Sequence, residues 1–244
     1  MKKLVLSSVC AFAMAGAAFA QGTVNWSTIS SSNMSGQTNS TAYSPLFGGG
    51  STGTGAVGNI STAPAGFYYE LLYTSQLVSG QQVQDPYPTT LASLFTWKDA
   101  GLGGTNSIAI GRVVVPLGNQ NNAGASLPSS WNNGTTNDIM LVGWSANLGT
   151  TWGAVSNVLN HWATLGSTVV GQAFFGESAT GFINPLTTGT SPGAAVFGSP
   201  NAQGTPIFSP NTQLYLLPVP EPATMALMGL GGLSLLLFRR SRKS

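Results

Sequence analysis

One segment of this 244-residue chain resembles a nucleophile motif: Gly176-Glu177-Ser178-Ala179-Thr180 nearly fits the G-x-S-x-G pattern. In that pattern a serine lies on a sharp turn after a strand and attacks a carbonyl carbon with the help of a histidine base. The turn needs glycine at its last position, which here is Thr180, and the only histidine, His161, precedes the serine instead of following it. A secreted hydrolase is therefore an unfavoured alternative, and we expect no catalytic residue and no enzymatic activity.

Carboxylates could supply a different chemistry, because most glycosidases use two of them beside the bond that breaks. Folding could bring Asp85 beside Asp99, or Glu70 beside Glu177, but nothing in the sequence favours either pair. A metal centre is not expected, since the chain has one histidine and one cysteine and its acids follow no calcium-loop pattern. The G-x-G-x-x-G match at residues 53–58 lacks the preceding strand and following helix of a dinucleotide site, so no cofactor is expected either.

Aromatic side chains are the main sequence feature that points to a ligand. Flat indole and phenol rings can stack on sugar rings, and the chain has six tryptophans and six tyrosines. Trp131 differs from the other tryptophans because it lies in a polar loop, where binding residues concentrate. We therefore take Trp131, with Tyr68 and Tyr87, as a candidate platform for an extracellular polysaccharide.

Few charges are available to position any ligand, because Lys and Arg total 8, Asp and Glu total 6, and charged residues are 6% of the chain. Most cations lie near the two ends, and residues 23–218 contain only Lys98 and Arg112 against five acids. Two cations cannot neutralise the several phosphates that a nucleic-acid groove must contact, so nucleic acid is excluded as a partner. Low charge with abundant Gly, Ser, Thr and Asn instead indicates an exported β-protein.

The N-terminus has the three parts of an export signal. Met1–Lys3 is a short cationic segment, Leu4–Ala17 is apolar, and Ala18-Phe19-Ala20 fits the A-x-A cleavage pattern. The apolar segment is shorter than the about 20 residues that a membrane-spanning helix needs. We therefore expect residues 1–20 to be a helical signal peptide, which signal peptidase recognises through Ala18 and Ala20 and cuts before Gln21.

The C-terminus, residues 219–244, combines a rigid motif, an apolar run and a basic tail. Val219-Pro220-Glu221-Pro222 precedes Ala223–Phe238, which as a helix would reach about 24 Å, short of a bilayer core of about 30 Å. Arginines at its end can extend this reach, and basic clusters stay on the cytoplasmic side. We therefore expect a transmembrane helix over residues 223–238, stopped by Arg239, Arg240, Arg242 and Lys243.

This order of parts resembles the PEP-CTERM sorting signal of Gram-negative bacteria, and residues 219–224 (VPEPAT) have the form of that family's motif. The resemblance implies that an exosortase, a membrane enzyme, recognises Val219, Pro220, Glu221 and Pro222 and cleaves near the prolines. It also implies transient residence in the inner membrane and then release to the cell surface or the extracellular matrix, often among exopolysaccharides. The segment Val142–Gly176 is similar to the body of PEP-CTERM proteins from Verrucomicrobia-like bacteria, a similarity that implies no activity.

Residues 21–218 are expected to form one exported domain. Short apolar runs punctuated by Gly, Pro and Asn predict an antiparallel β-sandwich, whereas residues 31–62, rich in Ser, Thr, Asn and Gly, predict a flexible polar insertion. One short helix is expected over Thr151–Leu165, where apolar residues recur at helical spacing and Gly166 suits a C-terminal cap. The expected strands are residues 23–30, 66–74, 91–97, 107–116, 138–145, 168–176 and 213–218.

These patterns predict a mainly β protein with a signal helix at one end and a transmembrane helix at the other. The favoured function is that of an exported, exosortase-sorted protein of the cell surface or matrix, with a structural or interaction role. A carbohydrate-binding module that holds exopolysaccharide is the alternative.

Overall fold

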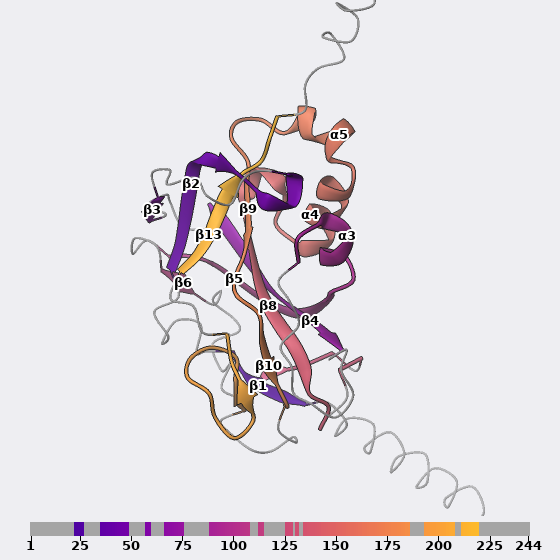
Figure 1. The fold of residues 1–244 in the computed structure, drawn as a ribbon, viewed down its shortest axis with the longest axis vertical. Helices are drawn as coiled ribbons and strands as arrows, with labels where there is room; N and C mark the ends of the chain where they lie inside the picture. The colour runs from indigo at the N-terminus through magenta and orange to yellow at the C-terminus, as the bar shows by residue number, and fades with distance from the viewer. Residues whose placement is uncertain are drawn as a thin grey trace, which may run out of the picture.

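The computed structural model describes residues 22–26, 35–48, 57–59, 66–75, 88–107, 112–114, 125–128, 130–131, 134–185, 193–207 and 211–219. In these residues the chain is mainly β, as expected, with short helices packed beside a long sheet (Figure 1). The predicted signal peptide, Gln21, and the tail from Pro220 onward lie outside the described residues. Within the described part, no helix is both long enough and apolar enough to span a membrane.

The centre of the fold is a pair of nine-residue strands, β4 (Phe67–Ser75) and β8 (Asn137–Ser145). They run antiparallel and pair along their whole length, from Phe67 opposite Ser145 to Ser75 opposite Asn137. Every residue of β8 is buried. Its apolar residues follow one another without alternation, which is the pattern of a strand covered on both faces. The strands expected at 66–74 and 138–145 are thereby confirmed.

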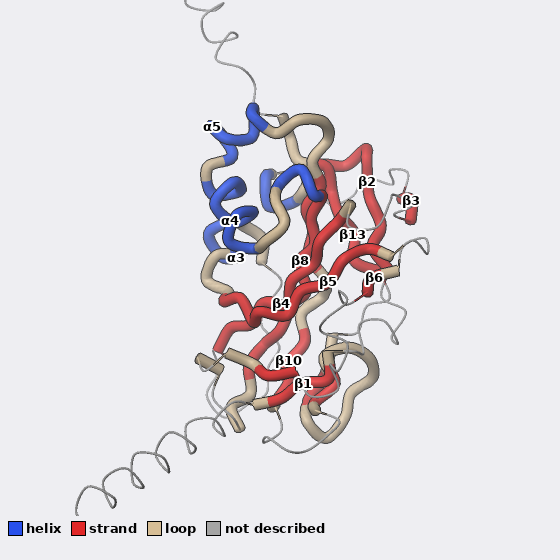
Figure 2. The backbone as a smooth tube through the Cα atoms, turned by 180° about the vertical axis from the view of Figure 1, so that it is seen from behind, coloured by secondary structure: helices blue, strands red, loops and turns tan. Residues whose placement is uncertain are grey.

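Both strands belong to a ten-stranded sheet that curls along the molecule (Figures 1 and 2). The last strand in sequence, β13 (Asn211–Leu216), lies inside this sheet between β2 (Ser35–Tyr43) and β9 (Phe174–Glu177). The order along the sheet is β3 (Val57–Asn59), β2, β13, β9, β8, β4, β5 (Lys98–Asn106) and β6 (Val113–Val114). Two further strands lie off this path: β10 (Gly181–Ile183) pairs with β8, and β12 (Gly204–Thr205) pairs with β10.

A second sheet has three short strands, in the order β11 (Ala194–Ala195), β1 (Thr23–Asn25) and β7 (Ala125–Ser126). Two pairs of neighbours are parallel, β13 with β2 and β1 with β11, so the expectation of a purely antiparallel fold is wrong. Parallel neighbours need long connections, and here each pair joins segments from opposite ends of the domain. Such a pairing leaves no local signal in the sequence.

Alternate side chains of β4 and β8 contribute to two separate cores on the two faces of the large sheet. Leu71 and Leu141 point into the first core, which also holds Val24 of the small sheet, so on this face two sheets pack together. Leu72 and Met140 point into the second core, which the helices cover. Figure 2 shows the helices gathered on one side of the strands. The fold is therefore sandwich-like on one face and covered by helices on the other.

Three α-helices occur in the described residues where one was expected: α3 (Leu91–Leu94), α4 (Trp152–Asn160) and α5 (Trp162–Leu165). The segment 91–97 was expected to be a strand, but Thr90 and Ser93 form a capping box that starts α3. The helix expected over 151–165 is broken at His161, whose φ of −112° and ψ of 30° are not helical. Gly166 takes right-handed helical angles and begins the 3-10 helix η4 (Gly166–Thr168), so it is not a left-handed cap.

Within the region 31–62, the described residues 35–48 and 57–59 include regular structure where a flexible polar insertion was expected. β2 occupies Ser35–Tyr43 and pairs in parallel with β13, and the 3-10 helix η1 (Pro45–Phe47) follows it. The register shifts after Asn39, whose side-chain oxygen accepts hydrogen bonds from the backbone N–H groups of Thr41 and Ala42 at 3.1 and 2.8 Å. Backbone hydrogen bonds to β13 hold this polar strand in place, and they require no apolar side chain, so composition alone predicts a loop.

Candidate functional site

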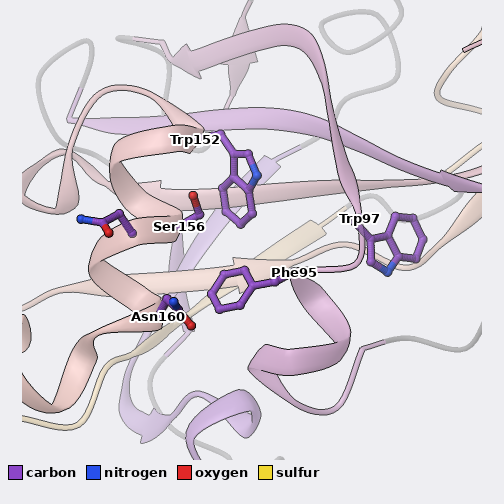
Figure 3. A pocket seen from close by; sticks show the side chains of 6 residues that line it. Phe95, Trp97, Trp152, Ser156 and Asn160 are labelled. Atoms are coloured by element: carbon purple, nitrogen blue, oxygen red, sulfur yellow. The ribbon is translucent and has the colours of Figure 1, made fainter. Parts of the chain in front are cut away.

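An open groove of about 390 Å³ lies between α4 and the residues that follow α3 (Figure 3). Two aromatic residues, Phe95 and Trp97, line it from the α3 side. The α4 side contributes Trp152, Ser156, Asn157 and Asn160. In Figure 3, Phe95 reaches across toward Ser156 and Asn160. The lining combines apolar ring surface with neutral polar groups, and no charged side chain of the described residues belongs to it.

Helical geometry places the α4 residues along this groove. Trp152, Ser156 and Asn160 are four residues apart, so they lie on one face of the helix. The side chain of Thr151 caps the helix by accepting a hydrogen bond from the Ala154 N–H at 3.4 Å. The ring of Trp152 stacks on Phe175 of β9 at 6.3 Å between centroids, which fixes the helix against the sheet.

The indole N–H groups separate the tryptophans into two sets. Trp26, Trp131, Trp144 and Trp162 each donate to a backbone carbonyl, at distances from 2.7 to 3.2 Å. In the described part of the chain, the indole N–H groups of the two groove tryptophans, Trp97 and Trp152, have no protein acceptor. A mostly buried indole N–H usually has a partner. Both N–H groups are open to solvent, and in Figure 3 the ring of Trp97 points away from Trp152, Ser156 and Asn160, so of these two tryptophans Trp152 is the one that lies beside the polar side chains of α4.

The amides of Asn157 and Asn160 are a second set of groups for a ligand. Both residues are exposed, and among the described residues neither side chain has a protein hydrogen-bond partner. Ser156 donates to the Gly153 carbonyl oxygen at 3.2 Å, and its oxygen can still accept. An array of amides, a hydroxyl and indole N–H groups beside aromatic rings suits a neutral ligand with many hydroxyl groups. The four-residue spacing along 152–160 is the sequence signal that could have located this face, but its partners after α3 were assigned to a strand.

The aromatic platform predicted from the sequence does not form. Trp131 is fully buried, stacks on Tyr73 at 4.8 Å, and donates its indole N–H to the Thr135 carbonyl oxygen. The expectation that Trp131 is an exposed loop residue is therefore wrong, because the surrounding loop packs the ring into the first core. Tyr68 is half-buried against Trp144, with 6.4 Å between ring centroids, and Tyr87 lies outside the described residues.

Ser178, the serine of the nucleophile-like motif at residues 176–180, is buried and hydrogen-bonded to the backbone. Ser178 is 1% exposed, and its hydroxyl donates to the Ala179 carbonyl oxygen at 2.7 Å while accepting from the Leu141 N–H at 2.9 Å. These bonds tie the end of β9 to β8. His161 is exposed at the end of α4, with its Nδ1 2.9 Å from the Asn157 carbonyl oxygen. In the described residues, no contact joins this histidine to Ser178.

The structure brings together one pair of acids, and it is neither of the pairs considered from sequence. Pairing of β4 with β5 places Glu70 beside Asp99, next to a register shift between Glu70 and Leu72. The pKa of Glu70 is raised to about 9, first by burial and then by the charge of Asp99 and a hydrogen bond to it, against a lowering effect of the Leu102 backbone. Glu70 is therefore protonated at neutral pH and can donate to Asp99. Asp85 lies outside the described residues.

A third acid, Glu177, lies in the same row across the sheet. Glu70 and Glu177 are both opposite Val142 of β8, one on each side, so two strand spacings, about 10 Å, separate their backbones. Glu177 is 6% exposed, and its Oε2 has no hydrogen-bond partner among the described residues. Burial raises the pKa of Glu177 to about 8, so this carboxyl is also mostly neutral at pH 7. In the described residues there is no cluster of three potential metal ligands.

The chain leaves the folded domain beside α5. Trp162 donates its indole N–H to the Pro218 carbonyl oxygen at 2.7 Å, and Leu217 donates its backbone N–H to Ala173 at 2.8 Å. Val219, the first residue of the predicted sorting motif, is 76% exposed. The other predicted processing residues lie outside the described part of the chain: Ala18, Ala20, Gln21, Pro220, Glu221, Pro222, Arg239, Arg240, Arg242 and Lys243.

Comparison with known proteins identifies one segment of the chain. Residues 218–243 match the family model described as the PEP-CTERM protein-sorting motif. The match supports a PEP-CTERM protein, that is, an exported protein targeted to an exosortase and sorted at the membrane, as the tail predicted. No curated protein and no solved structure matches the chain, so the resemblance of its body to Verrucomicrobia-like proteins stays a prediction.

Proposed function

We propose that this chain is a non-catalytic protein of the cell surface or extracellular matrix of a Gram-negative bacterium. Signal peptidase removes residues 1–20, the tail holds the precursor in the inner membrane, and the exosortase then cuts near Glu221 and releases the domain. The sorting motif at residues 218–243 is the observation that carries the proposal. The exposure of Val219, next to the Pro218 that Trp162 holds to the domain, supports it, because a motif that follows an exposed exit from a folded domain is accessible to a processing enzyme.

The state of the acids and of Ser178 supports a role without catalysis. A glycosidase needs one protonated and one ionised carboxyl group about 5 to 9.5 Å apart. Glu70 and Glu177 both have raised pKa values, while Glu70 and Asp99 are hydrogen-bonded directly to each other. Ser178 is buried with its hydroxyl already engaged on both sides. A secreted hydrolase remains the less favoured proposal.

The proposed processing is tested by Glu221→Ala in cells with and without the exosortase. Glu221 is the only acid of the motif and lies between two prolines that keep it extended, so its loss should prevent cleavage and leave export intact. We expect the variant to accumulate uncut in the inner membrane, as wild type does without the enzyme, by fractionation and intact mass. Asp85→Asn, which removes one acid of the exported domain outside the sorting motif, is the control for total charge. Surface arrival of the Glu221→Ala protein at wild-type mass and rate would contradict the proposal.

A carbohydrate-binding role is a second candidate, favoured by one observation. The only tryptophans in the described residues without an indole N–H acceptor, Trp97 and Trp152, both line the same groove. Sugar hydroxyls can accept from these groups and from Asn157 and Asn160, while Phe95 offers an apolar ring. Since the groove lining contributed by the described residues carries no charge, we propose a neutral polysaccharide as the ligand.

Titration of the full chain in mild detergent with neutral glucans and mannans, followed by tryptophan fluorescence, tests this role. Replacing Asn157 and Asn160 together with alanine removes two donors on the exposed helix face, so we expect affinity to fall about tenfold or more. Gln172→Ala is the matched control and should bind as wild type does, because Gln172 is an exposed amide outside the groove whose side chain, among the described residues, has no hydrogen-bond partner. No binding by wild type, or equal binding by the double variant, would exclude the groove as a saccharide site.

A further inference from the structure

The end of the molecule where the chain leaves the domain has an apolar surface. Among the described residues, the large hydrophobic side chains that are exposed are Tyr43 (48%), Val170 (87%) and Val219 (76%). Tyr43 and Val219 line one hollow of about 330 Å³, and Val170 lies between two further lining residues of that hollow, Val169 and Gly171. Exposed apolar side chains are usually scattered over a protein, so two that line one hollow, with a third next to lining residues in the chain, indicate a surface that something else covers.

A second hollow, of about 500 Å³, adjoins the first. Both hollows share Trp162 and Val219, which lie at the chain exit. The second is otherwise lined mainly by apolar residues such as Phe47 and Leu159. Among the described residues, no charged residue lines either hollow. We call the residues Tyr43, Trp162, Val170 and Val219 the exit surface.

The length of chain beyond the exit limits how far this surface can lie from a membrane. The bond from Trp162 holds Pro218 to the domain, and the apolar run begins at Ala223. Even a fully extended chain spans at most about 17 Å between these two residues. The headgroup region on one side of a bilayer is itself about 5 to 7 Å thick. When the apolar run spans the bilayer, the exit surface is therefore within about 10 Å of the headgroups.

We propose that the exit surface docks on the outward-facing interface of the bilayer in the uncut precursor. Tyrosine favours the interfacial region, where its ring can be buried while its hydroxyl stays hydrated, and Tyr43 is 48% exposed. Trp162 is 8% exposed with its N–H bonded to Pro218, so it forms the floor of the hollow and not an anchor. Val170 and Val219 add apolar contacts, and the lack of charge in both hollows removes the cost of stripping water from ions. This inference rests on the membrane-held precursor of the proposed function, but it concerns the orientation of the domain and not its processing.

Cysteine accessibility in spheroplasts without exosortase tests the docking. The full chain carries Cys10→Ser and either Val170→Cys or, as the control, Asn201→Cys, an exposed residue of the segment with β11 and β12, which lies at the opposite end from α5 (Figure 1). A membrane-impermeant maleimide reacts with the thiolate, which forms poorly in an apolar environment. We expect Val170→Cys to react about tenfold more slowly in spheroplasts than after detergent, and Asn201→Cys to react equally in both.

Fractionation of the same cells separates this proposal from that of the membrane-held precursor. Equal reaction of Val170→Cys before and after detergent, in protein that does sediment with the membrane, overturns the docking alone. Protein that is absent from the membrane overturns both proposals. If Val170→Cys stays protected from the maleimide in a chain that ends after Pro218, a second copy of the chain covers the surface. If Val170→Cys is protected only when exosortase is present, the enzyme covers it. Each of these two results also overturns docking on lipid.

Discussion

At the scale of single residues, Glu177 has a buried carboxyl group whose Oε2 lacks a hydrogen-bond partner among the described residues. Its folded pKa of about 8 lies above the value of an exposed glutamate, so the folded state holds a proton that the unfolded state releases. The free energy of unfolding is therefore greatest below about pH 4.5, if only this group is considered, and falls as the pH rises toward 8. Glu70, with a raised pKa of about 9, acts in the same direction.

Glu177→Gln should weaken this pH dependence, because the amide stays neutral at every pH. We expect the melting temperature of the wild-type full chain to fall between pH 5 and pH 9, and that of Glu177→Gln to fall distinctly less. Thermal unfolding in mild detergent at a series of pH values measures both slopes. Arg112→Gln, which removes an exposed charge, should keep the wild-type slope. Identical slopes for wild type and Glu177→Gln would show that this carboxyl is not buried as described.

At the scale of elements, close contact between β9 and β13 explains why residue 176, the first of the nucleophile-like motif at residues 176–180, is a glycine. A Cβ built on Gly176 would lie 2.0 Å from the backbone oxygen of Gln213, whereas one built on Gly153 in α4 meets nothing within 4 Å. Gly176 is therefore required by the packing of the two strands, and the resemblance to a nucleophile turn has a structural cause. Gly153 only adds flexibility to the unfolded chain.

Alanine at these two glycines should have opposite effects on stability. Gly176→Ala forces β9 away from β13, and we expect a loss of about 3 kcal/mol or more, in the range of severe overpacking. Gly153→Ala should raise the free energy of unfolding by about 0.5 to 1 kcal/mol, since alanine is the better helix former. Urea unfolding of the full chain in detergent measures both changes. A Gly176→Ala protein as stable as wild type would contradict the strand packing described here.

At the scale of the whole molecule, the last strand completes a sheet whose other members come much earlier in the chain. β13 lies between β2 and β9, and its end is the start of the exit segment, beside α5. The chain enters the described fold at β1, at the opposite end of the molecule from α5 (Figure 1). The domain can therefore close only once residues 211–216 are exported, directly before the sorting segment.

Two truncations test this dependence on β13. A chain that ends after Pro218 keeps the strand and the bond from Trp162, so we expect a folded periplasmic protein with near-ultraviolet circular dichroism. A chain that ends after Pro210 leaves β2 and β9 with unpaired edges, and we expect it to aggregate or be degraded. Yield in the periplasm and the dichroism spectrum distinguish the two. Equal yield of folded protein from both would show that the sheet does not need its last strand.

Features that depend on neighbouring residues were readable from the sequence. The sorting tail is a linear motif, and the family match at residues 218–243 bears out its assignment, while the signal peptide stays a prediction. The mainly β class and the strands β4, β8 and β13 follow from short apolar runs, because side-chain alternation and apolar content are local properties. The helix over residues 151–165 was also evident, apart from its break at His161.

Only the tertiary structure decided which distant segments meet. Parallel pairing of β2 with β13 turned a polar tract into a strand, and loop packing buried Trp131. Pairing of β4 with β5 brought Glu70 to Asp99 and raised its pKa, and the approach of α3 to α4 made the groove. Burial, pKa and a shared cavity depend on neighbours far along the chain. Residue type and spacing show which groups are available, and the energy of packing them together determines which of them remain free for a ligand.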